Sequence, residues 1–146
     1  MIAPIFIFLL IIILDQFTKW YAYFFSWHVI NKGFAWSLGQ NLSPYLLIFL
    51  VLIILGYIFK TLVYSWKNNK KIAELIIFAG GFSNLLDRLF LFGVIDFIGI
   101  NLIIGNYEIS SPIFNIADIA ITLGIIWIIL RECGLKFLCY VQQSDQ

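Results

Sequence analysis

Residues 72–92 read IAELIIFAGGFSNLLDRLFLF, an apolar run long enough to cross a membrane as a helix, yet it carries Asp87 and Arg88 near one end. A charged side chain at the centre of a bilayer costs about 2.5–3.5 kcal/mol on the scale most tolerant of charge. Ionisable groups in such a segment therefore need partners or a function. The run predicts a membrane helix with a polar site near one end.

The composition of the whole chain agrees with a membrane protein. Of its 146 residues, 62% are hydrophobic and only 12% are charged, and the mean hydropathy is +0.99. A soluble domain of this composition would present too much apolar surface to water. A net charge of +1 offers no basic surface for nucleic acid. Cys133 and Cys139 have no further Cys or His at ligand spacing, so we expect no zinc site, no disulfide framework and no cofactor.

Four apolar runs divide the chain into membrane spans. Each has the length of about 20 residues that crosses about 30 Å of hydrocarbon. The predicted spans are roughly residues 3–23, 44–66, 72–92 and 113–133. The first has no basic residue before it and no small-residue cleavage site after it, so we expect a retained helix rather than a signal peptide. The sequence thus predicts an all-α integral membrane protein, with residues 1–146 as a single membrane domain.

Most of the basic residues lie on one side of these spans. The residues on that side are Lys60, Lys67, Lys70, Lys71, Arg131 and Lys136. The positive-inside rule assigns this side to the cytoplasm, and both termini with it. Residues 24–43 and 93–112 then lie on the outer face.

The two outer segments are not simple polar loops. Residues 27–38 mix β-branched, aromatic and turn residues, which predicts short strands that form a small β-type cradle on the membrane surface. Residues 97–109 are rich in apolar residues and contain Gly99 and Gly105. We expect this second stretch to be a mobile interfacial lid with at least two positions, closed over an empty site and displaced when the site is occupied.

Several polar residues reach a similar depth near the outer face in this topology. The acids are Asp15, Asp87, Asp96 and Asp118. Possible partners at spacings of three or four residues on the same helix faces are Lys19, Asn84, Arg88 and Asn115. Gly80 and Gly81 precede the polar part of the third span, where small residues let helices approach closely in lipid. The polar faces of these spans can therefore meet near the outer face of the membrane.

Five short motifs occur in order along the chain. They are Asp15-x-x-x-Lys19, Asn31-x-Gly33-x-Ala35, Gly81-x-x-Asn84-x-x-Asp87-Arg88, Val94-Ile95-Asp96-Phe97 and Phe114-Asn115-x-Ala117-Asp118. On a four-span chain of this length, the ordered set resembles the lipoprotein signal peptidases, the signal peptidase II enzymes of the bacterial plasma membrane. The resemblance covers roughly residues 10–130.

This resemblance implies an aspartic endopeptidase whose catalytic pair would be Asp96 and Asp118. It implies cleavage of diacylglyceryl-modified prolipoproteins just before the S-lipidated cysteine, with membrane lipid around the enzyme and the cyclic peptide globomycin as an inhibitor. No metal is expected. The residues expected to bind substrate or support the pair are Asp15, Lys19, Asn31, Gly33, Asn84, Asp87, Arg88 and Asn115.

The chemistry of two such acids follows from general principles. Neither Asp96 nor Asp118 has a cation three or four residues away, and an unpaired acid next to lipid is a candidate for chemistry. Two carboxylates within hydrogen-bond reach cannot both ionise cheaply, so one keeps a proton. One member can then activate a water while the other protonates the scissile carbonyl.

The supporting residues have a structural alternative. Asp15 and Lys19 could neutralise each other within one helix. Asp87 and Arg88 could tie the third span to the outer segments by buried hydrogen bonds. Asparagines could satisfy backbone groups between helices.

Functions of other classes also stay open. Acids on three of four spans could relay protons in a proton-coupled membrane transporter subunit. A small membrane scaffold is a further alternative. The discriminating observation is whether Asp96 and Asp118 lie close together, as a shared proton requires.

Overall fold

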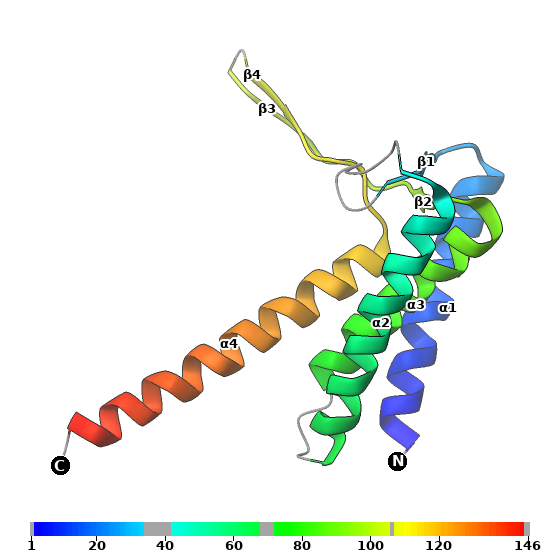
Figure 1. Ribbon diagram of the computed structural model, residues 1–146. Helices are drawn as coiled ribbons and strands as arrows, with labels where there is room; N and C mark the ends of the chain where they lie inside the picture. The colour runs from blue at the N-terminus through cyan, green and yellow to red at the C-terminus, as the bar shows by residue number, and fades with distance from the viewer. Residues whose placement is uncertain (1, 34–41, 68–71, 106, 145–146) are drawn as a thin grey trace.

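Four long helices make up most of the chain in the computed structural model, which describes residues 2–33, 42–67, 72–105 and 107–144 (Figure 1). The helices are α1 (Ile2–Phe24), α2 (Pro44–Lys67), α3 (Ile72–Leu91) and α4 (Ile116–Ser144). The strands are β1 (Val29–Asn31), β2 (Val94–Asp96), β3 (Asn101–Ile104) and β4 (Tyr107–Ser110). Each helix coincides with a predicted span, except that α4 begins three residues later and continues well past residue 133.

The burial pattern is the reverse of that in a water-soluble protein. The largest fully buried side chains are all polar: Lys19, Asn115, Asp15 and Ser83. Large apolar side chains, such as those of Phe6, Tyr57 and Phe90, are instead exposed. Helices α1 and α2 are also long and apolar enough to cross a membrane. An apolar surface around a polar interior indicates that the surroundings are lipid rather than water.

Helix α3 contacts each of the other three helices. Small residues permit a very close approach between α3 and α4. A Cβ atom added at Gly80 would lie 2.6 Å from the backbone oxygen of Ala117, and one added at Gly124 would lie 2.9 Å from the backbone oxygen of Ala73. The two helices are therefore in backbone contact at two levels.

One pair of strands joins the two outer segments. Strand β1 lies within residues 27–38, where the sequence predicts short strands; residues 34–38 lie outside the described residues. It pairs antiparallel with β2, with Val29 opposite Asp96 and Asn31 opposite Val94. This pairing places the first outer segment directly beside Asp96.

The second pair of strands forms the hairpin β3–β4, whose turn contains Gly105 in the left-handed region (φ 62°). Two backbone hydrogen bonds between Ile98 and Phe114 (2.8 and 2.9 Å) close its base. The hairpin occupies the segment predicted to be a lid, but it projects away from the helices, and Ile103 and Tyr107 are each 77% exposed (Figure 1). The closed position expected of an empty enzyme is thus not observed, because the strands satisfy each other's backbone groups without lying on the helices.

Replacing Gly80 with alanine should separate α3 from α4. The new methyl group would meet a backbone oxygen, which cannot move as a flexible side chain can, so we expect Gly80→Ala to lose about 1–3 kcal/mol of stability. Gly56→Ala on α2 is the matched control, because nothing lies within 4 Å of its added Cβ. Thermal unfolding of both variants in detergent checks this, and equal stability of the two would contradict it.

Candidate active site

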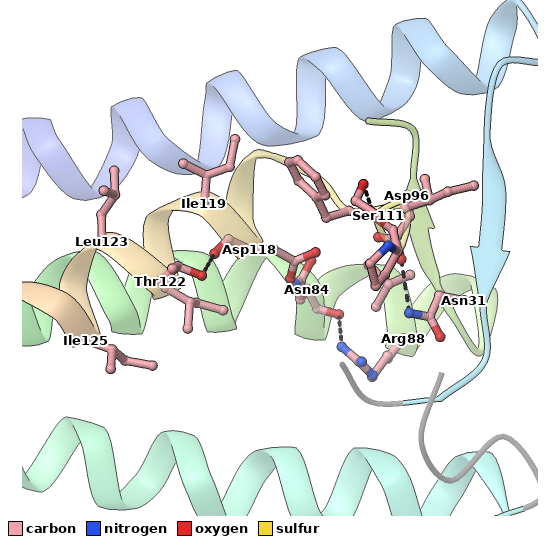
Figure 2. A pocket seen from close by; sticks show the side chains of 15 residues that line it. Asn31, Asn84, Arg88, Asp96, Ser111, Asp118, Ile119, Thr122, Leu123 and Ile125 are labelled. Carbon is pink, nitrogen blue, oxygen red and sulfur yellow. Dashed lines mark hydrogen bonds between the residues drawn. The ribbon is translucent and has the colours of Figure 1, made fainter. Parts of the chain in front are cut away.

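A cavity of about 680 Å³ lies beside α3, α4 and the β1–β2 pair, and both Asp96 and Asp118 line it (Figure 2). Its other polar lining residues are Asn31, Asn84, Arg88, Ser111 and Thr122. Its apolar lining residues are Val94, Pro112, Ile113, Phe114, Ile119, Ile121, Leu123 and Ile125. The two carboxyl groups therefore share one largely apolar cavity.

Asp96 is the last residue of β2 and is only 3% exposed. Its carboxylate accepts hydrogen bonds from the side-chain amides of Asn115 (2.6 Å) and Asn31 (3.0 Å). Burial raises the pKa of the Asp96 carboxyl above its ordinary value, and the charge of Asp118 adds to the rise, while the two amide hydrogen bonds oppose it. This carboxyl is therefore suited to holding a shared proton.

Asp118 lies in the first turn of α4 and takes part in a reciprocal cap. Asn115 Oδ1 accepts the backbone N–H of Asp118 (2.9 Å), and Asp118 Oδ2 accepts the backbone N–H of Asn115 (3.2 Å). This capping box satisfies two N–H groups at the start of the helix. Asp118 Oδ1 accepts a further hydrogen bond from Asn84 Nδ2 (2.9 Å). The carboxylate is thus held by α4 on one side and by α3 on the other.

Asn115 connects the two carboxyl groups. Its Oδ1 holds the backbone of Asp118, and its Nδ2 donates to Asp96 Oδ1. The same Nδ2 lies 3.3 Å from Asn84 Oδ1 and 3.4 Å from the backbone oxygen of Ile95. One amide therefore contacts both acids, which come from β2 and α4.

Lys19 of α1 is the centre of the polar network behind the two acids. It is 1% exposed, and its ammonium lies 2.7 Å from Asp15 Oδ2, 2.9 Å from Asp87 Oδ2 and 2.7 Å from Asn84 Oδ1. An ammonium group has three donors, so these contacts use all of them. Because Lys19 can only donate hydrogen bonds, the group of Asn84 that faces it must be the oxygen Oδ1. The nitrogen Nδ2 of Asn84 is then directed at Asp118.

Ser83 and Gln16 also belong to this network, and sequence reasoning missed both as functional residues. Ser83 Oγ donates to Asp15 Oδ2 (2.8 Å), and Gln16 Nε2 donates to Ser83 Oγ (3.0 Å) and Asp87 Oδ1 (2.9 Å). Asp15 Oδ1 accepts the backbone N–H of Ala117 (2.7 Å), which links α1 to the start of α4. The available signal was that each missed residue directly adjoins a motif residue.

Asp87 and Arg88 tie α3 to the outer segments. Asp87 Oδ2 accepts the backbone N–H of Ile95 (3.2 Å), and Arg88 Nη2 donates to the backbone oxygen of Gly33 (2.9 Å). The Gly33 N–H in turn donates to Asn31 Oδ1 (3.0 Å), which leaves Asn31 Nδ2 directed at the carboxylate of β2. Every residue that the sequence predicts for the site therefore lies in one connected network.

This network can perform acid–base chemistry at a carbonyl group. Two carboxyl groups face one cavity, and one of them favours its protonated form. Among the described residues, no group of three or more His, Cys, Asp and Glu side chains is placed to hold a metal ion. The arrangement is that of a carboxylate pair supported by amides and one buried ammonium group.

A family model described as signal peptidase (SPase) II matches residues 7–133 of this chain. The chain belongs to the signal peptidase II family. This is a family of aspartic peptidases, and the match includes both acids, α2, α3, the four strands and most of α1 and α4.

Similar proteins carry the same family name. The lipoprotein signal peptidase of Bartonella henselae is 40% identical over 112 residues, which is 73% of this chain and 64% of that protein. The lipoprotein signal peptidase of Borrelia hermsii is 34% identical, covering 92% of this chain and 91% of that one. The chain thus spans under two thirds of the first relative and most of the second.

The fold is similar to that of a solved bacterial membrane enzyme determined by the in meso method. The TM-score is 0.69 at 29% identity, over 90% of this chain and 88% of that chain. A second solved bacterial membrane enzyme gives a TM-score of 0.65, also at 29% identity. Both similarities agree with the fold of a bacterial membrane enzyme.

Replacing Lys19 with methionine should destabilise the fold, since it leaves Asp15 and Asp87 without their ammonium partner. Breaking a buried pair by removing one partner costs about 3–5 kcal/mol. Lys32→Met, at an exposed lysine, is the control and should leave stability unchanged. Thermal unfolding in detergent measures both, and a Lys19→Met variant as stable as the parent would refute the role of this ammonium.

The raised pKa of Asp96 gives stability a definite pH dependence. The folded protein binds the Asp96 proton more tightly than the unfolded chain does. The stabilisation of the fold by this proton is fully present at pH values below the ordinary carboxyl pKa, and it is lost as the pH rises through the raised pKa of the folded state. Asp96→Asn removes this titration. The difference in melting temperature, variant minus parent, should therefore increase as the pH rises above the ordinary range of carboxyl pKa values. A constant difference would show that Asp96 does not titrate abnormally.

Proposed function

We propose that this chain is a lipoprotein signal peptidase, an aspartic endopeptidase that removes signal peptides from diacylglyceryl-modified prolipoproteins by cutting just before the S-lipidated cysteine. The observation that carries the proposal is that Asp96 and Asp118 line one cavity and contact a common amide, that of Asn115. Membership of the signal peptidase II family supports the same activity.

In the proposed mechanism the two carboxyl groups share one proton. The ionised member takes a proton from water, whose oxygen attacks the scissile carbonyl carbon, while the protonated member donates its proton to the carbonyl oxygen. The resulting gem-diol collapses when the C–N bond breaks: the carboxyl that took the proton from water gives it to the departing nitrogen, and the other carboxylate accepts a gem-diol O–H proton, which restores the starting pair. The amides of Asn31, Asn84 and Asn115 hold the carboxyl groups in place during these steps.

The largely apolar cavity suits a lipid-modified peptide. Small residues before the cleavage site would lie near the two acids, and the acyl chains would extend into membrane lipid. Asn31 and Arg88, which line the same cavity, are placed to hydrogen-bond a peptide backbone. Globomycin would inhibit by occupying this cavity.

We place all four helices across the inner membrane of a bacterium, in one membrane domain with both termini in the cytoplasm. This orientation is supported by the basic residues after α2 and by exposed aromatic residues at the far end of α1 and just beyond it, including Trp20, Phe24 and Trp27. Although α3 and α4 carry ionisable groups, those of α3 (Glu74, Asp87 and Arg88) are buried, and Arg131 of α4 pairs with Glu74. The cavity then lies near the outer face, with β1–β2 as its cradle and the β3–β4 hairpin as a lid that moves over bound substrate.

A proton-coupled transporter would need ionisable groups spaced across the membrane. In the described part of the chain, the buried ionisable groups instead form two clusters, one around Lys19 and one around Glu74, which pairs with Arg131 (2.8 Å). Glu74 and Asp87 are 13 residues apart on α3, a distance of about 20 Å in a helix. The peptidase function is the better supported of the two.

Asp96→Asn and Asp118→Asn should each lower turnover at least about 100-fold, because an amide keeps the shape of the side chain but removes the acid or base. The assay follows cleavage of a diacylglyceryl-modified precursor by the purified enzyme. Glu132→Gln, an exposed acid on α4 far from the cavity, should keep turnover within about twofold.

Retention of more than about one hundredth of the parent turnover by either aspartate variant would exclude the carboxylate pair. Failure of the parent enzyme to cut the lipidated precursor would overturn the proposed function itself. An unlipidated precursor serves as the negative substrate.

A further inference from the structure

Asp15 and Asp87 each hold the backbone next to one member of the proposed catalytic pair. Asp15 Oδ1 accepts the backbone N–H of Ala117 (2.7 Å). Asp87 Oδ2 accepts the backbone N–H of Ile95 (3.2 Å). Ala117 directly precedes one acid of the pair in the sequence, and Ile95 directly precedes the other. The positions of the two catalytic carboxyl groups therefore depend on how Asp15 and Asp87 are oriented.

Each of these two supporting acids is oriented by a hydrogen bond from a neutral side chain. The terminal torsion of an aspartate is broad, so the carboxylate rotates unless its oxygens are held. Ser83 Oγ donates to Asp15 Oδ2 (2.8 Å), which leaves Oδ1 directed at the backbone N–H at the start of α4. Gln16 Nε2 donates to Asp87 Oδ1 (2.9 Å), which leaves Oδ2 directed at the backbone N–H in β2.

Gln16 and Ser83 are also hydrogen-bonded to each other, and we refer to these two side chains as the Gln16–Ser83 bridge. The hydroxyl of Ser83 has one hydrogen, which it donates to Asp15. It therefore accepts the hydrogen bond from Gln16 Nε2 (3.0 Å). The same Nε2 donates to Asp87 and to the backbone oxygen of Ser83 (3.1 Å). One amide thus connects the acid that holds α4 to the acid that holds β2.

Lys19 contacts the same two acids but holds them in a different way. Its ammonium lies 2.7 Å from Asp15 Oδ2 and 2.9 Å from Asp87 Oδ2. An ammonium group is a compact charge whose three donors rotate on a flexible stem, so it neutralises carboxylates without fixing their rotation. Lys19 therefore balances the charge of the two acids, and the Gln16–Ser83 bridge sets their rotation.

We propose that Gln16 and Ser83 are positioning residues of the peptidase reaction, which set the separation of the two catalytic carboxyl groups through Asp15 and Asp87. The inference rests on the proposed function. Ser83 is fully buried and Gln16 is half-buried, and lipid offers no water to replace a lost hydrogen bond. The cavity is lined by other residues, so the bridge acts through the two supporting acids rather than on the substrate.

The first test replaces the amide of Gln16. Gln16→Met keeps an unbranched side chain of similar length and removes the donor to Ser83 and Asp87. Cleavage of a diacylglyceryl-modified precursor by the purified enzyme should show kcat lowered about 10- to 100-fold, with KM changed less than about twofold. Ser83→Ala, the smaller change, should lower kcat in the same way but less, and it provides the test if Gln16→Met does not fold.

Thr18→Val is the matched control on the same helix. Thr18 is half-buried like Gln16, and its hydroxyl donates to the backbone oxygens of Leu14 (2.8 Å) and Asp15 (2.9 Å). These hydrogen bonds lie within α1, so their loss should leave kcat within about twofold of the parent. An equal fall in kcat for Thr18→Val and Gln16→Met would overturn the inference.

The pH profile of kcat separates positioning from a general loss of stability. Two carboxyl groups that share a proton titrate in two steps, and the interval between the steps widens as the groups approach each other. This interval sets the width of the bell-shaped profile of kcat. Gln16→Met should narrow the bell, because like charges that are no longer held move apart. The charged side chains around the pair, all kept in this variant, are Asp15, Lys19, Asp87 and Arg88. A lower bell of unchanged width would show that Gln16 serves stability alone.

A double variant tests whether Gln16 and Ser83 act as one unit. Gln16→Met and Ser83→Ala together should lower kcat by less than the product of their separate effects, because both interrupt one chain of hydrogen bonds. A fall equal to that product would exclude the bridge. If the parent cuts the precursor and Gln16→Met keeps the full kcat, this inference fails while the proposed function stands. If the parent cuts no lipidated precursor, the proposed function itself fails.

Discussion

The ion pairs of Lys19 are the interaction on which the other polar contacts depend. In an apolar environment Asp15 or Asp87 alone would be an uncompensated charge, and one ammonium group between them satisfies both. Asp15 also accepts the backbone N–H of Ala117, so the same cluster fixes where α4 begins relative to α1 and α3. Because these two acids take the ionic contacts of Lys19, neither Asp96 nor Asp118 forms a salt bridge with it. The proposed catalytic pair can therefore share a proton.

Three asparagines of the site are each oriented by a contact to their side-chain oxygen from a group other than a carboxylate. Lys19 holds the oxygen of Asn84, the backbone N–H of Asp118 holds that of Asn115, and the backbone N–H of Gly33 holds that of Asn31. In every case the amide nitrogen is left to donate to a carboxylate. These donors offset part of the cost of burying the carboxyl groups, which helps one of the two to ionise in an apolar cavity.

The helices and the composition of the site could be predicted from the sequence, because apolar length sets the spans and polar residues within them must converge on partners. Strand β2 could not be predicted from the sequence. Val94–Asp96 is too short to show the alternation of side chains along a strand, and it is defined by its pairing with β1. The orientation of each amide depends on contacts between helices, so it has no sequence signal. The roles of Ser83 and Gln16 also depend on contacts between helices, and their only sequence signal is that each adjoins a motif residue. The sequence of residues 97–109 predicts a mobile interfacial lid and not the hairpin β3–β4, because its apolar residues suit either structure.

The backbone hydrogen bonds between Ile98 and Phe114 hold the two ends of the hairpin segment together beside the site. They join the chain just after Asp96 to the chain just before Asn115, so the two ends of the intervening segment are held together whatever its length. Lengthening a loop whose ends are already fixed adds little entropic cost. Changes of length or sequence within the hairpin itself, residues 101–110, can therefore be accommodated without moving the acids, and because none of the described residues of the hairpin lines the cavity, the cavity stays the same.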